Sequence, residues 1–250
     1  MEVENWSVRH PEFPDRHVIR DVSFNVRADE VVGIAGLMGA GRTKLAMSLF
    51  RRSCGRNIED VVRIGGRPVR LNTVSDAIRA GLAYVTEDRK SLGLILGDSI
   101  QRNITLANLG AVFNRGLLDD ARETQVAEGY RKRMKIRTPG VFQRVVNLSG
   151  GNQQKIVLSK WLFSDPDVLI LDEPTRGIDV GAKFEIYVLI NALSEQGKGV
   201  VTISSKMPEL LGMCDRIYVM NQGAILGELT AAEASQERIM SMIVTTEETV

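Results

Sequence analysis

The chain has 250 residues, and its 32 Lys and Arg residues nearly balance 31 Asp and Glu residues, giving a formal net charge of +1. This balance provides no global basic field for nucleic acid or a membrane surface, so we expect partners to be recognised locally. Hydrophobic residues make up 44% and charged residues 25%, which is typical of a globular protein and excludes a disordered or collagen-like chain.

Cysteine usage and hydropathy indicate the compartment. Cys54 and Cys214 lie far apart and have no CxxC or His partner, so neither a disulfide framework nor a zinc site is indicated. A reducing compartment is then the default. We see no secretory signal and no apolar run of membrane-spanning length, which predicts a cytoplasmic chain.

The first part of the sequence predicts an antiparallel sheet followed by a strand, a loop and a helix. Apolar alternation indicates antiparallel strands of an edge sheet at Val3–Val8 and Val18–Val26, with a Pro-containing loop at Pro11–Asp15. The apolar run Val31–Ala35 predicts a buried strand, and after a Gly-rich turn leucine spacing predicts a helix over Arg42–Arg52. This order is the one found in phosphate-binding motifs.

The middle and end of the chain differ in pattern. Residues 98–146 have helical spacing, few glycines, and nine basic against five acidic side chains, which predicts an inserted helical subdomain. After them, strands alternate with helices, as in a parallel sheet covered by helices. The expected strands are Val168–Leu171, Gly199–Ile203 and Arg216–Met220, and the expected helices are Gly181–Glu195, Pro208–Met213 and, after a hairpin at Asn221–Gly223, Ala231–Ile243.

The Gly-rich turn matches the phosphate-loop pattern GxxxxGK[ST], except that Arg42 stands where the pattern has Lys. Glycines let backbone N–H groups at a helix N-terminus point at phosphates, and Thr43 is placed to ligate Mg²⁺. Taken alone, the turn is explained equally well as a tight connection, and a dinucleotide fingerprint fits worse because Lys44 is not glycine. The candidate phosphate-binding residues are Gly36, Leu37, Met38, Gly39, Ala40, Gly41, Arg42, Thr43 and Lys44.

Two carboxylates follow the predicted strand that ends at Leu171. Open α/β sheets bind ligands at the carboxyl ends of their strands. There Asp172 would hold Mg²⁺ and Glu173 would polarise the water that attacks a γ-phosphate. The alternative is that the two acids only end a strand and open the turn at Pro174.

A third motif, LSGGNQQK at Leu148–Lys155, begins an apolar helix. Ser149 is a suitable N-cap, which is the structural interpretation. The functional interpretation is that Ser149, Gly150 and Gly151 present an open helix N-terminus to an anion. Gly151 of this motif lies 21 residues before Asp172, and this order and spacing are specific.

Together the three motifs resemble the ATP-binding cassette (ABC) family over essentially the whole chain. The resemblance implies one α/β P-loop NTPase domain over residues 1–250, with a RecA-like core and an antiparallel β-subdomain in 1–90 and 151–250 and a helical subdomain in 91–150. The signature and the segments Asp172–Gly181 and Ser204–Glu209 resemble monosaccharide importers whose ATPase subunit is a tandem of two cassettes. The chain resembles the second, C-terminal cassette of such a subunit, particularly of the xylose and multiple-sugar type.

The resemblance also implies ligands and partners. These are ATP and Mg²⁺, a second cassette in the N-terminal half of the same native subunit, transmembrane permease subunits and, indirectly, a periplasmic sugar-binding protein. The chain would lie peripherally on the cytoplasmic face of the inner membrane, where Arg89 and Lys90 are candidate contacts to the permease. Nucleic acid is not expected, because the basic run Arg131–Lys135 lacks interleaved aromatics and fits a solvated helix face.

Further residues take roles from the family. Asp179 is a candidate nucleotide contact, and an adenine-stacking aromatic is expected near His10, with Trp6 and Phe13 as neighbours. Trp6 is alternatively a core residue of an edge strand. The candidate catalytic residues are Glu173, Ser205 and Glu87, and the candidate metal ligands are Thr43, Glu87 and Asp172.

Three positions depart from the family pattern: Arg42 replaces Lys, Glu87 replaces the Gln of the lid loop, and Ser205 replaces the switch His. Losing one transition-state donor costs about 10²- to 10³-fold in rate. We therefore expect this chain to bind ATP at its own phosphate loop but to hydrolyse it poorly, while its signature completes the site of the first cassette. One alternative is a non-hydrolysing regulatory module. The other is a non-transport ABC ATPase, and the importer form of the signature argues against that second alternative.

Overall fold

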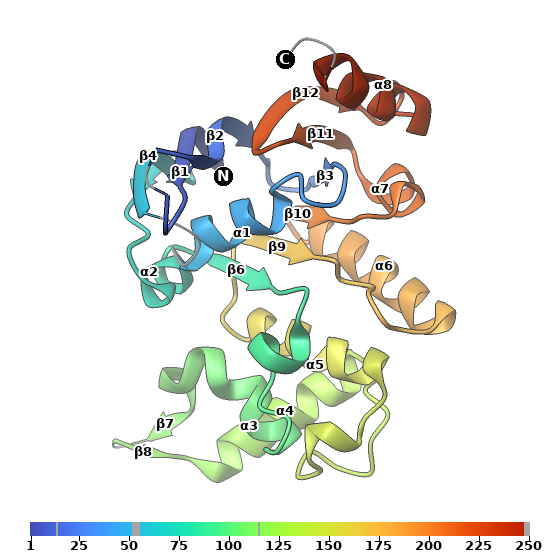
Figure 1. The fold of residues 1–250 in the computed structure, drawn as a ribbon. Helices are drawn as coiled ribbons and strands as arrows, with labels where there is room; N and C mark the ends of the chain where they lie inside the picture. The colour runs from blue at the N-terminus through green and yellow to red at the C-terminus, as the bar shows by residue number, and fades with distance from the viewer. Residues whose placement is uncertain (14, 52–55, 115, 248–250) are drawn as a thin grey trace. The chain divides into compact units, whose positions relative to one another are not determined.

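The computed structural model describes residues 1–13, 15–51, 56–114 and 116–247, which form two compact units (Figure 1). The first unit contains Met1–Tyr84, Asp167–Glu173 and the residues from Tyr187 on; the second contains Val85–Pro166 and Pro174–Ile186. The expected helical insertion, residues 91–150, falls within the second unit. Our expectations for Pro14, Arg52 and Cys54 lie outside the described residues.

One sheet of the first unit is antiparallel, as the alternating pattern predicts. Val3 pairs with Phe24 and Trp6 with Val22, so the apolar residues of two strands share one face. The strand that carries Trp6 lies between two others, which corrects its prediction as an edge strand. The sheet order is β2-β1-β4-β5, with β1 (Glu2–Arg9), β2 (His17–Asn25), β4 (Arg56–Ile64) and β5 (Arg67–Val69).

The second sheet of this unit contains the parallel strands. Three of them, β3, β9 and β10, are buried at every residue, which accounts for their continuous Val, Ile and Leu runs. β10 runs parallel to both β3 and β9, whereas β11 and β12 form the predicted antiparallel hairpin. The order is β12-β11-β3-β10-β9-β6, with β3 (Val31–Ala35), β6 (Leu82–Val85), β9 (Val168–Asp172), β10 (Gly199–Ile203), β11 (Arg216–Asn221) and β12 (Ala224–Thr230).

Helices flank this sheet, with α7 packed on β3 and α8 packed on β11 and β12. The last helix begins at Gln236 and not at Ala231 as predicted, because Ser235 accepts a hydrogen bond from the Arg238 N–H and Glu233 closes a turn onto Thr230. The other predicted helices are correct to within a residue or so at their ends. The helices are α1 (Arg42–Arg51), α2 (Val74–Arg79), α7 (Met207–Met213) and α8 (Gln236–Glu247), and α6 (Val180–Ser194) begins in the second unit and ends in the first.

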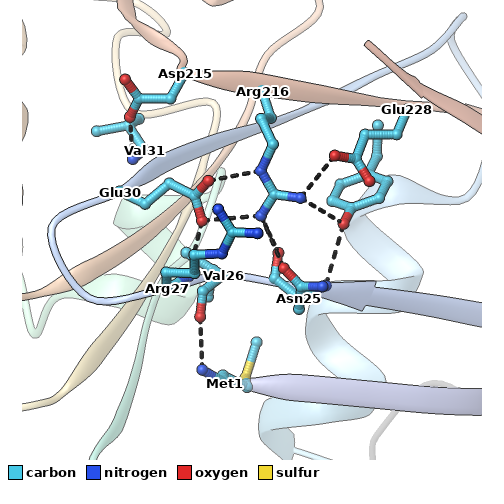
Figure 2. Close-up of polar contacts among 10 residues, drawn as sticks. Met1, Asn25, Val26, Arg27, Glu30, Val31, Asp215, Arg216 and Glu228 are labelled. Atoms are coloured by element: carbon cyan, nitrogen blue, oxygen red, sulfur yellow. Dashed lines mark hydrogen bonds and ion pairs between the residues drawn. The ribbon is translucent and has the colours of Figure 1, made fainter. Parts of the chain in front are cut away.

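A partly buried arginine, Arg216, joins the two sheets of the first unit (Figure 2). Arg216 donates to both carboxylate oxygens of Glu30, at 2.6 and 2.9 Å, and also to Glu228 at 2.7 Å and to the Asn25 side chain at 2.8 Å. Burial alone would raise the pKa of Glu30, but these hydrogen bonds outweigh it and hold that pKa below its ordinary value. The cluster therefore fixes the end of β2 to the starts of β3 and β11.

The second unit is mainly helical. Its core includes Glu123, whose carboxylate accepts hydrogen bonds from Gln101 at 3.0 Å and from the hydroxyl of Thr105, so that α3 is joined to α4 through a satisfied buried acid. The elements are η1 (Arg89–Gly93), α3 (Ile100–Thr105), η2 (Leu106–Val112), β7 (Phe113–Asn114), β8 (Leu117–Leu118), α4 (Asp120–Arg133), η3 (Val145–Asn147) and α5 (Gly150–Leu162). In the described part of the chain, none of the helices combines the length and apolar character needed to span a membrane.

Candidate functional site

The glycine-rich turn connects β3 to α1 in the first unit and has the backbone geometry that the phosphate loop requires. Gly39 and Gly41 have φ values of +84° and +105°, a region that other residues avoid. A Cβ at Gly36 would lie 2.4 Å from the carbonyl oxygen of Met220. Met38 is 96% exposed at the tip, and Leu37 and Lys44 are also exposed, whereas Ala40 is buried. The loop is therefore anchored at its base and open to solvent at its tip.

Arg42 lies at the start of α1 and is buried, which its position in a loop motif does not indicate. Its Nη1 donates to the carbonyl oxygen of Ser204 at 2.6 Å. Burial lowers the pKa of Arg42, and the nearby carboxylates of Glu173 and Asp172 partly offset this effect. The guanidinium is thus engaged at the carboxyl ends of β9 and β10, within the same unit as the glycine loop.

Asp172 ends β9 and is completely buried. Its Oδ2 accepts a hydrogen bond from the Tyr84 hydroxyl at 3.0 Å, whereas Oδ1 has no hydrogen-bond partner among the described residues. Burial raises the pKa of Asp172 to about 6, and the neighbouring hydroxyls of Thr43 and Tyr84 oppose this shift. A buried carboxylate with one unused oxygen beside a Thr hydroxyl is the donor set that Mg²⁺ prefers, so Thr43 and Asp172 fit a magnesium site.

Glu173 follows directly and adopts an uncommon backbone conformation, with φ of +47°. Its N–H donates to the carbonyl of Ile203 at 2.8 Å, and its Oε1 accepts from the N–H of Ser205 at 2.5 Å. The Ser205 side chain is exposed, and the contact to this acid comes from the Ser205 backbone. Strained backbone of this kind persists where surrounding contacts impose it. The carboxylate is therefore held by the main-chain N–H of Ser205 and not by the side chain at the switch position.

Glu87 belongs to the second unit and forms an ion pair with Arg176. Its negative charge is therefore compensated within that unit. Arg89, a predicted permease contact, directs its guanidinium toward the Arg176 and Gly177 carbonyls, whereas Lys90 is exposed. The predicted role of Glu87 as a metal ligand remains a prediction.

The signature forms the N-terminus of α5 in the second unit. Ser149 occupies the predicted N-cap position, but its side chain makes no capping hydrogen bond. Instead its Oγ accepts from the side-chain amide of Asn152 at 3.0 Å, and the Asn152 Oδ1 accepts from the Arg137 N–H at 2.9 Å. Ser149 is exposed and keeps its own proton to donate, while the first N–H groups of α5 remain uncapped by it.

A pocket of about 220 Å³ lies beside the signature. Gly151 lines it, and Asp179 caps α6 there by accepting from the Ala182 N–H at 2.9 Å. Lys155 pairs with Glu185 and also donates to the Lys135 carbonyl at 3.1 Å. The sequence motif alone does not identify Asn152, Lys155 or Glu185 as residues that support the signature. The local indication in the sequence is that Asn152 lies three residues after Ser149.

The expected adenine-stacking region is partly corrected. Trp6 is 1% exposed and its indole N–H donates to the Ser48 hydroxyl at 2.9 Å, so it is a core residue and not a stacking platform. His10 packs against Phe13 with ring centroids 5.1 Å apart, and its Nδ1 accepts from the backbone N–H groups of Glu12 and Phe13. Phe13 is 58% exposed, so the His10 and Phe13 pair is the aromatic surface available in this region.

The chain resembles curated proteins along nearly its whole length. It is 55% identical to the L-arabinose transport ATP-binding protein AraG of Geobacillus stearothermophilus, covering 98% of this chain and 48% of the relative. It is 52% identical to the xylose import ATP-binding protein XylG of Thermoanaerobacter pseudethanolicus, covering 96% of this chain and 47% of that protein. The chain therefore spans about half the length of these relatives.

Solved structures agree on the fold. A nucleotide-free ATP-binding cassette from an ABC transporter matches with a TM-score of 0.76 at 18% identity, covering 96% of this chain and 93% of that one. A dimeric ATP-binding cassette bound to ADP and Pi matches with a TM-score of 0.77 at 20% identity, covering 92% and 98%. The sequence model of the family described as "ABC transporter" matches residues 19–176. The chain therefore belongs to the ABC transporter family and has the fold of its ATP-binding cassettes.

Proposed function

We propose that this chain is an ATP-binding cassette of a bacterial-type monosaccharide importer. It would bind Mg-ATP at its own phosphate loop and present its signature to the nucleotide of a second cassette. The names of its relatives, which include arabinose, xylose and ribose transport or import ATP-binding proteins, support the sugar class. Since the chain spans about half of these relatives, we further propose that the second cassette is the other half of the same native subunit.

The observation that carries the nucleotide-binding proposal is the arrangement of Asp172. A fully buried carboxylate at the end of β9 leaves one oxygen without a hydrogen bond, and such a group is costly unless a ligand completes it. Thr43 and Asp172 would hold Mg²⁺, which would neutralise phosphate charge there. The loop backbone and the N-terminus of α1 would cradle the phosphates.

We propose that hydrolysis at this chain's own site is weak. The guanidinium of Arg42 donates a hydrogen bond to the Ser204 carbonyl. The side chain of Ser205 is too short to replace the contact that a His would make. Glu173 is nevertheless placed to polarise a water. The contact of Arg42 also favours a second candidate function, a regulatory nucleotide-binding module without turnover.

The partners follow from the importer proposal. Transmembrane permease subunits would receive the conformational change, and a periplasmic sugar-binding protein would act indirectly through them. The chain would then lie on the cytoplasmic face of the inner membrane. The exposed Lys90 remains a candidate contact to the permease, whereas the guanidinium of Arg89 is engaged within its own unit.

Titration calorimetry with Mg-ATP tests the proposal. The wild-type chain should bind, Asp172→Asn should weaken binding, and Asp167→Asn, an exposed acid at the other end of the same strand, should not. Absence of binding by the wild type would contradict the proposal. Steady hydrolysis at the rate of a complete importer, abolished by Glu173→Gln, would contradict the weak-site part of it.

A further inference from the structure

Arg89 has an environment that neither the phosphate loop nor the fold explains. It begins the turn η1, is half-buried, and directs its guanidinium toward the segment that follows Pro174 in the same unit. Nη1 donates to the Arg176 carbonyl at 2.7 Å and Nη2 to the Gly177 carbonyl at 3.3 Å. One side chain therefore bridges two consecutive carbonyl groups of a distant segment.

The first signature glycine lies directly against this bridge. A Cβ at Gly150 would lie 2.7 Å from Nη2 of Arg89 and 2.8 Å from the Gly177 carbonyl oxygen. It would also meet Ile178 at 3.4 Å. Gly150 has no room for a side chain, because Arg89 and the segment 177–178 both approach its backbone. Arg89 is the charged group at this contact.

The bridge depends on the shape of the arginine. A planar guanidinium can donate to two neighbouring carbonyls at once, whereas a lysine ammonium is a compact point charge on a flexible stem. Burial lowers the pKa of Arg89, and its Nε–H is buried without a hydrogen-bond partner among the described residues. Burying a charge with one unsatisfied donor is unfavourable, so stability alone does not account for this placement.

A second contact joins the same two segments. Glu87, two residues before Arg89, forms an ion pair with Arg176. The lid-loop segment 87–89 therefore holds the 176–177 turn by one ion pair and by two hydrogen bonds. Two residues after Gly177, the side chain of Asp179 caps α6 at the pocket that Gly151 also lines.

We propose that Arg89 is a positioning residue for the signature: by holding the Arg176 and Gly177 carbonyls against Gly150, it sets the backbone that meets the nucleotide of a second cassette. This inference rests on the proposed function, in which the signature serves a nucleotide bound elsewhere. Arg89 acts through Gly150 and Asp179 and needs no contact with ATP. Its effect should therefore appear in pairing with a second cassette and not in binding of ATP to the chain's own phosphate loop.

The test uses the full chain carrying Glu173→Gln, so that bound ATP persists. Self-association in Mg-ATP is measured by analytical ultracentrifugation, Mg-ATP affinity by calorimetry, and thermal stability by scanning calorimetry. The variants are Arg89→Ala, Arg89→Lys and, as a matched control, Arg122→Ala, which removes an exposed arginine from α4 of the same unit. Arg89→Lys keeps the charge and provides a second variant if Arg89→Ala does not fold.

We expect Arg89→Ala to weaken Mg-ATP-dependent pairing by about tenfold or more, since charge-assisted hydrogen bonds are lost, while Mg-ATP affinity stays unchanged. Arg89→Lys should restore pairing only in part, and Arg122→Ala should pair like the parent. Pairing by Arg89→Ala equal to that of the parent would overturn the inference, as would a parallel loss of pairing, Mg-ATP affinity and thermal stability. A parent that binds Mg-ATP without pairing would also overturn it, whereas a parent that binds no Mg-ATP would instead refute the proposed function.

Discussion

The phosphate-loop region of the first unit and the signature region of the second use their polar groups in opposite ways. Around the loop, Asp172 and Arg42 are buried charges that bond to Tyr84 and to the Ser204 carbonyl of the same unit. At the signature, Ser149 is exposed, uncharged and oriented by Asn152 instead of capping its own helix. The first arrangement suits tight binding of an anion with its metal, because buried charges interact strongly. The second suits a surface that meets a ligand held by another molecule.

The largest expected effect comes from restoring the family residues at the phosphate-loop site. Arg42→Lys combined with Ser205→His should raise ATP turnover by about 10²-fold, since each lost transition-state donor costs about that much. Steady-state phosphate release measures the effect. Adding Glu173→Gln should abolish the gain. No gain in the double variant would show that these two positions do not limit turnover.

The next effect concerns the stability of the first unit. Arg216→Met should lower its free energy of unfolding by on the order of 3 kcal/mol, because Glu30, a buried acid, would lose its bidentate guanidinium partner. Denaturant unfolding measures the loss. Arg63→Met is the control, since the pair of Arg63 with Glu4 is more accessible to solvent and its loss should matter far less. Equal losses in both variants would contradict the role given to the buried cluster.

A pH-dependent effect should distinguish the second unit. Lys160 on α5 is buried, donates to the Gly93 carbonyl at 2.6 Å, and has its pKa lowered by burial from 10.5 to about 8. Its charge therefore costs stability below pH 8, and that cost is relieved as pH rises from about 8 to 10.5. Relative to Lys160→Met, the wild type should gain about 1 to 3 kcal/mol over this window in denaturant unfolding. A difference that stays constant with pH would refute this.

The smallest effect compares two N-caps. Thr73 accepts from the Asp76 N–H at 3.1 Å within a capping box, so Thr73→Ala should cost about 1 kcal/mol of stability. Ser149→Ala should cost clearly less, because the Ser149 side chain caps nothing. Urea unfolding of both variants checks this. Equal losses of stability in the two variants would mean that Ser149 does cap α5.

Local patterns in the sequence predicted the elements that carry the site. Continuous apolar runs gave β3 and β9, and the glycines at positions 39 and 41 have the positive φ values that a phosphate loop needs. The contacts of Arg89 could not be predicted in this way, because it lies 87 and 88 residues from its partners in the chain. The burial of Arg42 likewise depends on Ser204 at the end of another strand. Tertiary packing determines both the contacts of Arg89 and the burial of Arg42, and local sequence periodicity does not encode tertiary packing.

The most direct test of the central claim is Mg-ATP binding to Thr43→Ala and to Ser149→Ala, compared by titration calorimetry. Thr43 lies beside Asp172 in the first unit, whereas Ser149 lies in the second. If the chain binds its own nucleotide at the loop and offers its signature to another cassette, Thr43→Ala weakens binding by about tenfold or more and Ser149→Ala leaves it unchanged. Equal weakening in both variants would contradict this division.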